Sequence, residues 1–146
     1  IIPGSHHWPS FLQNNSERFE SRIVMVSIKK SNSIFLSGMN DSKLPIVISH
    51  GEGRAYLTEK DYMNLKDNNK VCMSYIDDSE EFSEIYPYNP NGSYMGVAGV
   101  SSSSGNVTLM MPHPERLMDI KQFPTNNNEK ISPWSKFFYN ARMHLK

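Results

Sequence analysis

The sequence has 146 residues, of which 38% are hydrophobic and 21% charged, and its 15 basic and 15 acidic residues give a formal net charge of zero. These values are typical of one globular domain and exclude a disordered chain, and apolar runs such as residues 46–48 are too short to span a bilayer. The zero net charge provides no long-range attraction for nucleic acid or an acidic membrane surface. The single cysteine, Cys72, cannot form an internal disulfide, and no signal-peptide pattern is visible, so we expect a reducing, cytoplasmic setting.

The first half of the chain alternates short apolar runs with polar turns. Residues 1–18 are rich in Pro, Gly, His and Asn, which is typical of a loop. The segment from Thr58 to Asp61 has the form of a capping box and predicts a helix to about Lys66. An apolar run that ends at Gly38 indicates a short helix or turn. Strands are predicted at residues 19–28, 46–49, 55–57 and 71–76.

The second half predicts a hairpin followed by a terminal helix. Strands at 96–100 and 107–111 flank a serine-rich stretch that is typical of a hairpin turn. Two segments before these strands are predicted to lack regular structure: residues 77–83 form an acidic turn, and residues 89–93 form a loop dense in turn formers. After the strands, Asn126–Asn128 indicates a mobile surface loop. Ser132 as N-cap and Pro133 at the first helical position predict an amphipathic helix over 134–145. Many short strands with few helices indicate the α/β class, although the helices are few for a complete domain.

The strongest chemical signal is the segment MMPHPER at residues 110–116, directly after a predicted strand. Two prolines bracket His113 and keep it out of a regular helix. Extended backbone would place His113 and Glu115 on the same side, where a carboxylate can fix the tautomer of an imidazole that serves a nucleophile. A structural histidine in a proline-rich turn is the alternative reading of this tripeptide.

A second candidate is the segment ISHGEGR at residues 48–54, where a strand runs into glycines. Glycines let backbone N–H groups approach a ligand closely. His50 and Glu52 form a second possible His–Glu pair, which competes with the first. A plain transition from strand to turn is the alternative.

Taken together, these segments resemble the glutaminase domain of phosphoribosylformylglycinamidine synthases, which belongs to the class I, triad-type glutamine amidotransferases. The last matching stretch resembles the C-terminus of the long, single-chain form of that enzyme. The resemblance runs in order through nearly the whole chain and is carried by residues 8–11, 16–22, 44–54, 86–93, 107–116 and 132–142.

The resemblance implies a three-layer, flavodoxin-like α/β domain with a parallel sheet, truncated on its N-terminal side, so that residues 1–146 form a partial domain. His113 matches the catalytic histidine and Glu115 the carboxylate that orients it, and Ser49, His50 and Gly51 match a segment that lines the glutamine site. The nucleophilic cysteine of the family lies upstream of the matching region, and Cys72 does not match it. Alone, the chain is therefore expected to lack glutaminase activity, and to self-associate through incompletely covered sheet surfaces or to need the rest of the enzyme.

The implied reaction releases ammonia from glutamine for the ATP-dependent amidation of formylglycinamide ribonucleotide in purine synthesis. The implied partners are glutamine and the synthetase domains of the same enzyme, with no nucleic acid and no membrane. ATP and Mg²⁺ belong to those synthetase domains, and no cofactor is expected in this chain. Three alternatives stay open: a cysteine hydrolase that uses Cys72 with His113 and Glu115, a docking module without chemistry, and a metal site from His6, His7 and His50.

Overall fold

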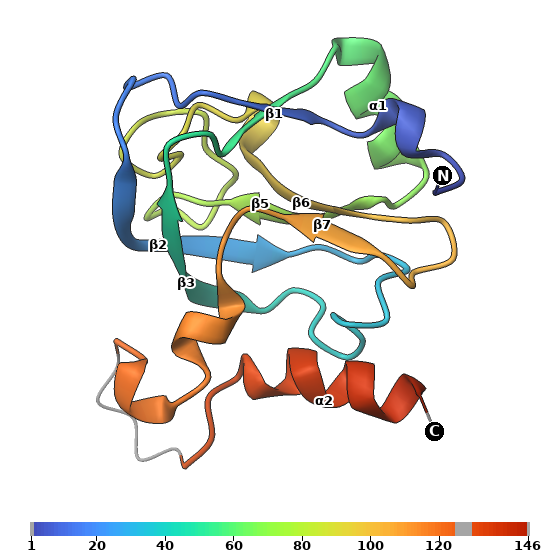
Figure 1. The fold of residues 1–146 in the computed structure, drawn as a ribbon, viewed down its shortest axis with the longest axis vertical. Helices are drawn as coiled ribbons and strands as arrows, with labels where there is room; N and C mark the ends of the chain where they lie inside the picture. Colours follow the sequence, from blue (N-terminus) through green and yellow to red (C-terminus); the bar gives the residue numbers. More distant parts are fainter. Residues whose placement is uncertain (1, 125–129, 146) are drawn as a thin grey trace.

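A computed structural model describes residues 2–124 and 130–145, and in it a five-stranded sheet lies between two helical layers (Figure 1). The strands are β1 (Ser10–Leu12), β2 (Glu20–Ile28), β3 (Lys43–His50), β4 (Arg54–Tyr56), β5 (Val71–Tyr75), β6 (Val97–Ser101) and β7 (Thr108–Met110). The α-helices are α1 (Glu59–Asp67) and α2 (Ser135–His144), and the short 3₁₀ helices are η1 (Ser5–His7), η2 (Tyr94–Gly96), η3 (Pro114–Leu117) and η4 (Ile120–Gln122). None of the helices in the described residues is long and apolar enough to cross a membrane.

The main sheet has the strand order β3-β2-β5-β6-β7, and every neighbouring pair is antiparallel. The mixed α/β class is confirmed, but the parallel strand order that the resemblance implied is wrong for this sheet. A parallel pair needs a long crossover, usually through a helix. The segments that link β2 to β3, β5 to β6 and β6 to β7 contain no α-helix, and α1 lies between β3 and β5, which are not neighbours in the sheet. Strands β1 and β4 form a separate two-stranded ribbon.

Two hydrophobic clusters make the layers. The larger cluster includes Val26 and Ile28 of β2, Ile46 of β3 and Trp134 beside α2, each 0% exposed. The smaller cluster joins α1 and the ribbon to the sheet through residues such as Leu65, which is also fully buried. Figure 1 shows α2 on one side of the sheet and α1 with β1 on the other. The three-layer arrangement is therefore present.

Local signals place most elements within two residues of their predicted positions. The Thr58 hydroxyl accepts a hydrogen bond from Asp61 N at 3.1 Å, as the capping box predicts. The helix α1 begins at Glu59, directly after Thr58. The predicted turn before Gly38 and the hairpin of β6 and β7 are also confirmed. The loop prediction for residues 1–18 is wrong in part, because η1 and β1 lie there. The loop predicted at Asn126–Asn128 lies outside the described residues.

The terminal helix is fixed to the sheet by one tryptophan. Trp134 is fully buried, and its indole Nε1 donates a hydrogen bond to Pro45 O of β3 at 2.7 Å. The helix itself begins at Ser135, with Trp134 as its N-cap residue in place of the predicted Ser132. This anchor holds Phe137 against the larger cluster, next to the segment that follows β7.

Candidate active site

His113 lies where β7 has ended and η3 is about to begin. Its backbone N–H donates to Val47 O of β3 at 2.7 Å, so that the histidine forms an isolated antiparallel bridge to the edge strand of the sheet. Pro114 then starts η3, and His113 is the N-cap residue of that turn. A backbone bridge on one side and a proline on the other hold His113 in place.

The structure brings His113 and Glu115 together. His113 Nδ1 and Glu115 Oε1 are 2.7 Å apart, and the two side chains are 31% and 51% exposed. The backbone between the two residues is not the extended strand that the sequence predicted. Glu115 lies in the first turn of η3, and its side chain reaches back to His113, the N-cap residue of that turn. The carboxylate favours the tautomer that carries a proton on Nδ1, which leaves Nε2 free to accept one.

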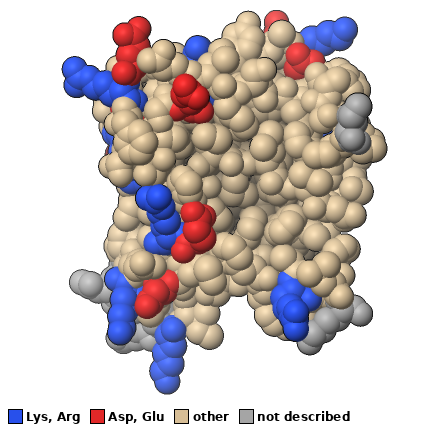
Figure 2. Space-filling view, in the orientation of Figure 1, with Lys and Arg blue, Asp and Glu red and all other residues tan. Residues whose placement is uncertain are grey.

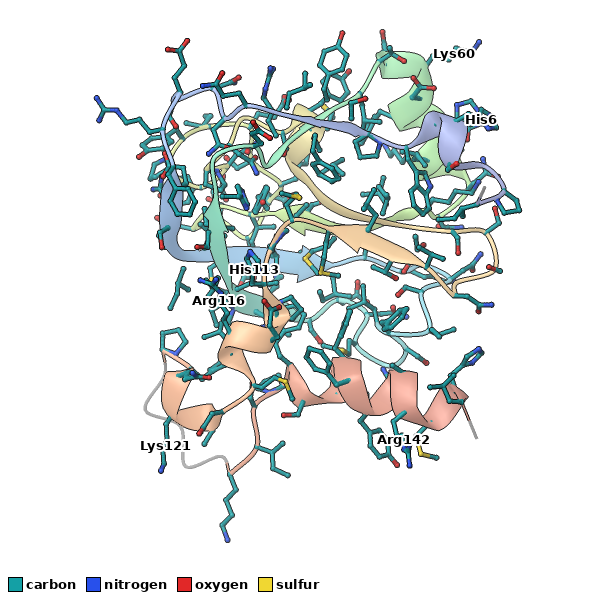
Figure 3. The ribbon with its side chains drawn as sticks, viewed as in Figure 1. His6, Lys60, His113, Arg116, Lys121 and Arg142 are labelled. Carbon is teal, nitrogen blue, oxygen red and sulfur yellow. The ribbon has the colours of Figure 1, made fainter. Side chains whose placement is uncertain are left out.

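This pair borders a pocket of about 500 Å³ between the sheet and α2. Ser49 and His50 line the pocket from β3, and Phe137 lines it from α2. Gly51 is not among the lining residues; its carbonyl accepts a hydrogen bond from Asn14 N at 2.8 Å. In Figure 3, His113 lies at mid-height, far from the labelled His6 and Lys60 above it and Arg142 below it.

The His50 imidazole lines the pocket and is contacted by the side chain of Asn91. Its residue is 6% exposed, and Nε2 lies 3.3 Å from Asn91 Nδ2. Nδ1 is buried without a hydrogen-bond partner among the described residues. Burial lowers the pKa of His50, and the charge of the nearby His113 lowers it further. Burial therefore favours the neutral form of the His50 imidazole.

A buried amide network, missed in the sequence, positions the turn after His50. Asn14 Nδ2 donates to His50 O at 2.8 Å, and Asn14 Oδ1 accepts from Gly53 N at 3.1 Å. Asn91 Nδ2 donates to Gly53 O at 2.7 Å. Both asparagines are 1% exposed. The sequence placed them in loops, and the only signal was their position among turn formers.

The competing chemical readings do not have the geometry they need. Glu52 is exposed, and no hydrogen bond joins it to the buried His50 in the described part of the chain. Cys72 is 0% exposed, and burial raises the pKa of its thiol to about 12, so it is unsuited to act as a nucleophile. The imidazole of His7 pairs with Asp61 at 2.7 Å. Within residues 2–124 and 130–145, no group of three or more His, Cys, Asp or Glu side chains could hold a metal ion.

Comparison with known families resolves which kind of domain carries this pair. A model of the CobB/CobQ-like glutamine amidotransferase domain matches residues 1–145. The chain belongs to this glutamine amidotransferase family. The fold is also similar to a solved structure described as PurLQS from Thermotoga maritima, with a TM-score of 0.66 and 27% sequence identity. That match covers 94% of this chain and 53% of the other, so this amidotransferase chain spans about half the length of its structural relative.

Proposed function

We propose that this amidotransferase chain supplies the histidine and the orienting carboxylate of a glutaminase, and that its nucleophile comes from polypeptide outside residues 1–146. The observation that carries the proposal is the contact of His113 Nδ1 with Glu115 Oε1, 2.7 Å apart at the edge of a pocket of about 500 Å³. The only cysteine of the chain is buried in the core. A thiol from a neighbouring segment would therefore have to reach Nε2 of His113.

The proposed reaction uses this pair twice. Nε2 of His113 takes the proton of the external thiol, and the thiolate attacks the amide carbon of the glutamine side chain. The C–N bond then breaks, the proton passes from Nε2 to the departing ammonia, and a thioester remains. In the second half, Nε2 takes a proton from water, and the resulting attack releases glutamate and the thiol. Glu115 steadies the imidazolium in both halves.

Ser49 and His50 are the proposed glutamine-binding residues of this chain. Both line the pocket beside His113. An imidazole whose neutral form is favoured would border the uncharged amide without placing a second positive charge beside His113. In Figure 2, charged side chains lie mainly toward the edges of the face shown, apart from one adjacent blue and red pair left of its centre. Gly51 would act only through its backbone, which Asn14 already holds.

The similarity to a PurLQS structure suggests the use of the ammonia. The proposed parent enzyme is a phosphoribosylformylglycinamidine synthase, in which synthetase domains with ATP and Mg²⁺ convert formylglycinamide ribonucleotide to the amidine in the cytoplasm. Those domains would be the partners of this chain. Its own share would be the release of ammonia, with no cofactor of its own.

The test compares His113→Ala with His6→Ala in the complete amidotransferase, with release of glutamate from glutamine as the readout. His6 is an exposed histidine outside the pocket, which makes its variant a matched control. We expect His113→Ala to reduce turnover by about 10⁴-fold or more, by analogy with other catalytic triads, and His6→Ala to retain it. A docking module without chemistry would instead retain activity in both variants. Glutamine turnover by the pure 146-residue chain would contradict the external nucleophile.

A further inference from the structure

A second cavity lies away from His113 and shares no lining residue with the first pocket. It has a volume of about 350 Å³ and is bordered by the end of β2, the second half of α1 and strand β5. Three lysines line it, Lys29, Lys30 and Lys66, together with the aromatic side chains of Tyr62 and Phe82. We refer to it as the lysine cavity. Its volume lies in the range of small-molecule sites, which run from roughly 300 to 1,000 Å³.

The lysine cavity concentrates positive charge in a chain whose net charge is zero. No acidic residue in the described part of the chain lines it. Among the described residues, no carboxylate forms an ion pair with Lys29, Lys30 or Lys66, whereas Lys43 elsewhere pairs with Glu80. Burial raises the pKa of Tyr62, and the negative charge of the nearby Glu84 raises it further. The Glu84 carboxylate already accepts a hydrogen bond from Met95 N at 2.8 Å. Three ammonium groups thus border the cavity without a paired carboxylate, which favours an anion.

The adjacent end of α1 does little to cancel this charge. A helix C-terminus carries partial negative charge on its free carbonyls. Here the last turn is closed by backbone hydrogen bonds, since Asn68 N donates to Asn64 O at 3.3 Å, Asn69 N to Lys66 O at 3.0 Å and Lys70 N to Leu65 O at 2.7 Å. These carbonyls already accept backbone hydrogen bonds, so they do not compete with a ligand for the lysine ammonium groups.

Two aromatic rings give the lysine cavity a second chemical character. Tyr62 is held in an edge-to-face contact with Tyr94, with 5.6 Å between ring centroids. Phe82 is 47% exposed, although it is large and apolar. A ligand with a flat ring would cover this exposed aromatic surface while its anionic end meets the lysines.

We propose that the lysine cavity binds a nucleoside monophosphate, with the phosphate held by Lys29, Lys30 and Lys66 and the base packed against Tyr62 and Phe82. The proposal does not depend on the glutaminase function, because none of these residues lines the His113 pocket. Both halves of the ligand are required. Free phosphate would leave the rings uncovered, and a nucleoside would leave the ammonium groups unpaired.

Calorimetric titration of the complete amidotransferase with adenosine 5′-monophosphate tests the proposal, with adenosine and inorganic phosphate as separate arms. One nucleotide should bind per chain, at least about tenfold more tightly than either part, because a charge-assisted contact is lost in one part and the stacking in the other. Lys66→Gln should weaken nucleotide binding about tenfold. Lys60→Gln, on the same helix but outside the cavity, should leave it unchanged.

Each contrary result overturns the proposal. Equal affinity for phosphate and for the nucleotide would show that the aromatic rings do not contribute to binding. Equal affinity for adenosine and for the nucleotide would show that the lysines do not contribute. Absence of binding, or equal effects of Lys66→Gln and Lys60→Gln, would remove the site. A photoreactive 8-azido derivative of the nucleotide, applied to the complete amidotransferase, provides a second measurement: the crosslink should map to the peptide of Tyr62 or Phe82 and vanish in Lys66→Gln.

Discussion

Two glycines in the turn after β3 should respond very differently to the same substitution. A Cβ added at Gly53 would lie 2.7 Å from His50 Cε1 and closer still to Cδ2 and Nε2. A Cβ at Gly51 would meet no atom of the described residues within 4 Å. In Gly53→Ala the imidazole must leave its place, which also breaks its 3.3 Å contact with Asn91. Overpacking costs about 1–3 kcal/mol and a lost hydrogen bond about 1 kcal/mol. We expect a loss of about 2–4 kcal/mol in the free energy of unfolding.

Urea unfolding followed by circular dichroism measures this loss, and the melting temperature should fall by about 3 °C for each kcal/mol in a chain of this size. Gly51→Ala should stay within about 1 kcal/mol of the parent, because the added methyl meets open space and restricts the unfolded chain. Removing the imidazole in Gly53→Ala/His50→Ala should make the two changes strongly non-additive. Equal stability of both alanine variants, or simple additivity in the double variant, would refute the packing described for His50.

Three further outcomes follow from the same turn and from the core. Asn14→Ala removes the side-chain hydrogen bonds to His50 O and Gly53 N, and it should lower the free energy of unfolding in urea by about 2–4 kcal/mol. Asn40→Ala on the surface should lower it by less than about 0.5 kcal/mol. Equal losses in the two variants would contradict the network. Because the pKa of His50 is lowered in the folded chain, the unfolded chain takes up protons first, so stability should fall as the pH drops through about 6.5, and His50→Gln should reduce that slope. With a buried thiol of pKa about 12, Cys72 should resist iodoacetamide at pH 8 until urea is added, as followed by mass spectrometry; rapid labelling of the folded chain would contradict its burial.

Signals local in sequence predicted the elements well, because their causes are local. The capping contact at Thr58 and the turn chemistry between β6 and β7 involve neighbours in the chain, and both appear where expected. The strand order has no such local cause. It depends on which surfaces pack together, and the parallel order taken from the resemblance is replaced by antiparallel pairs.

The candidate site was predictable in part for the same reason. His113 and Glu115 are two residues apart, so their pairing could be read from the sequence, although a 3₁₀ turn and not an extended strand brings them together. Asn14 and Asn91 reach the same turn from 39 and 38 residues away along the chain, and no sequence period marks such contacts. The bridge from His113 to Val47 belongs to the same class of long-range contact.

The central claim is that Glu115 orients His113 to serve a nucleophile from outside the chain, and the most direct measurement is kcat for glutamine hydrolysis by the complete amidotransferase carrying Glu115→Gln. An amide in place of the carboxylate favours the wrong imidazole tautomer, so kcat should fall by about 10²–10⁴-fold while KM changes little. The exposed Glu52→Gln serves as control and should keep full activity. A Glu115→Gln enzyme that turns over glutamine within twofold of the parent would contradict the claim.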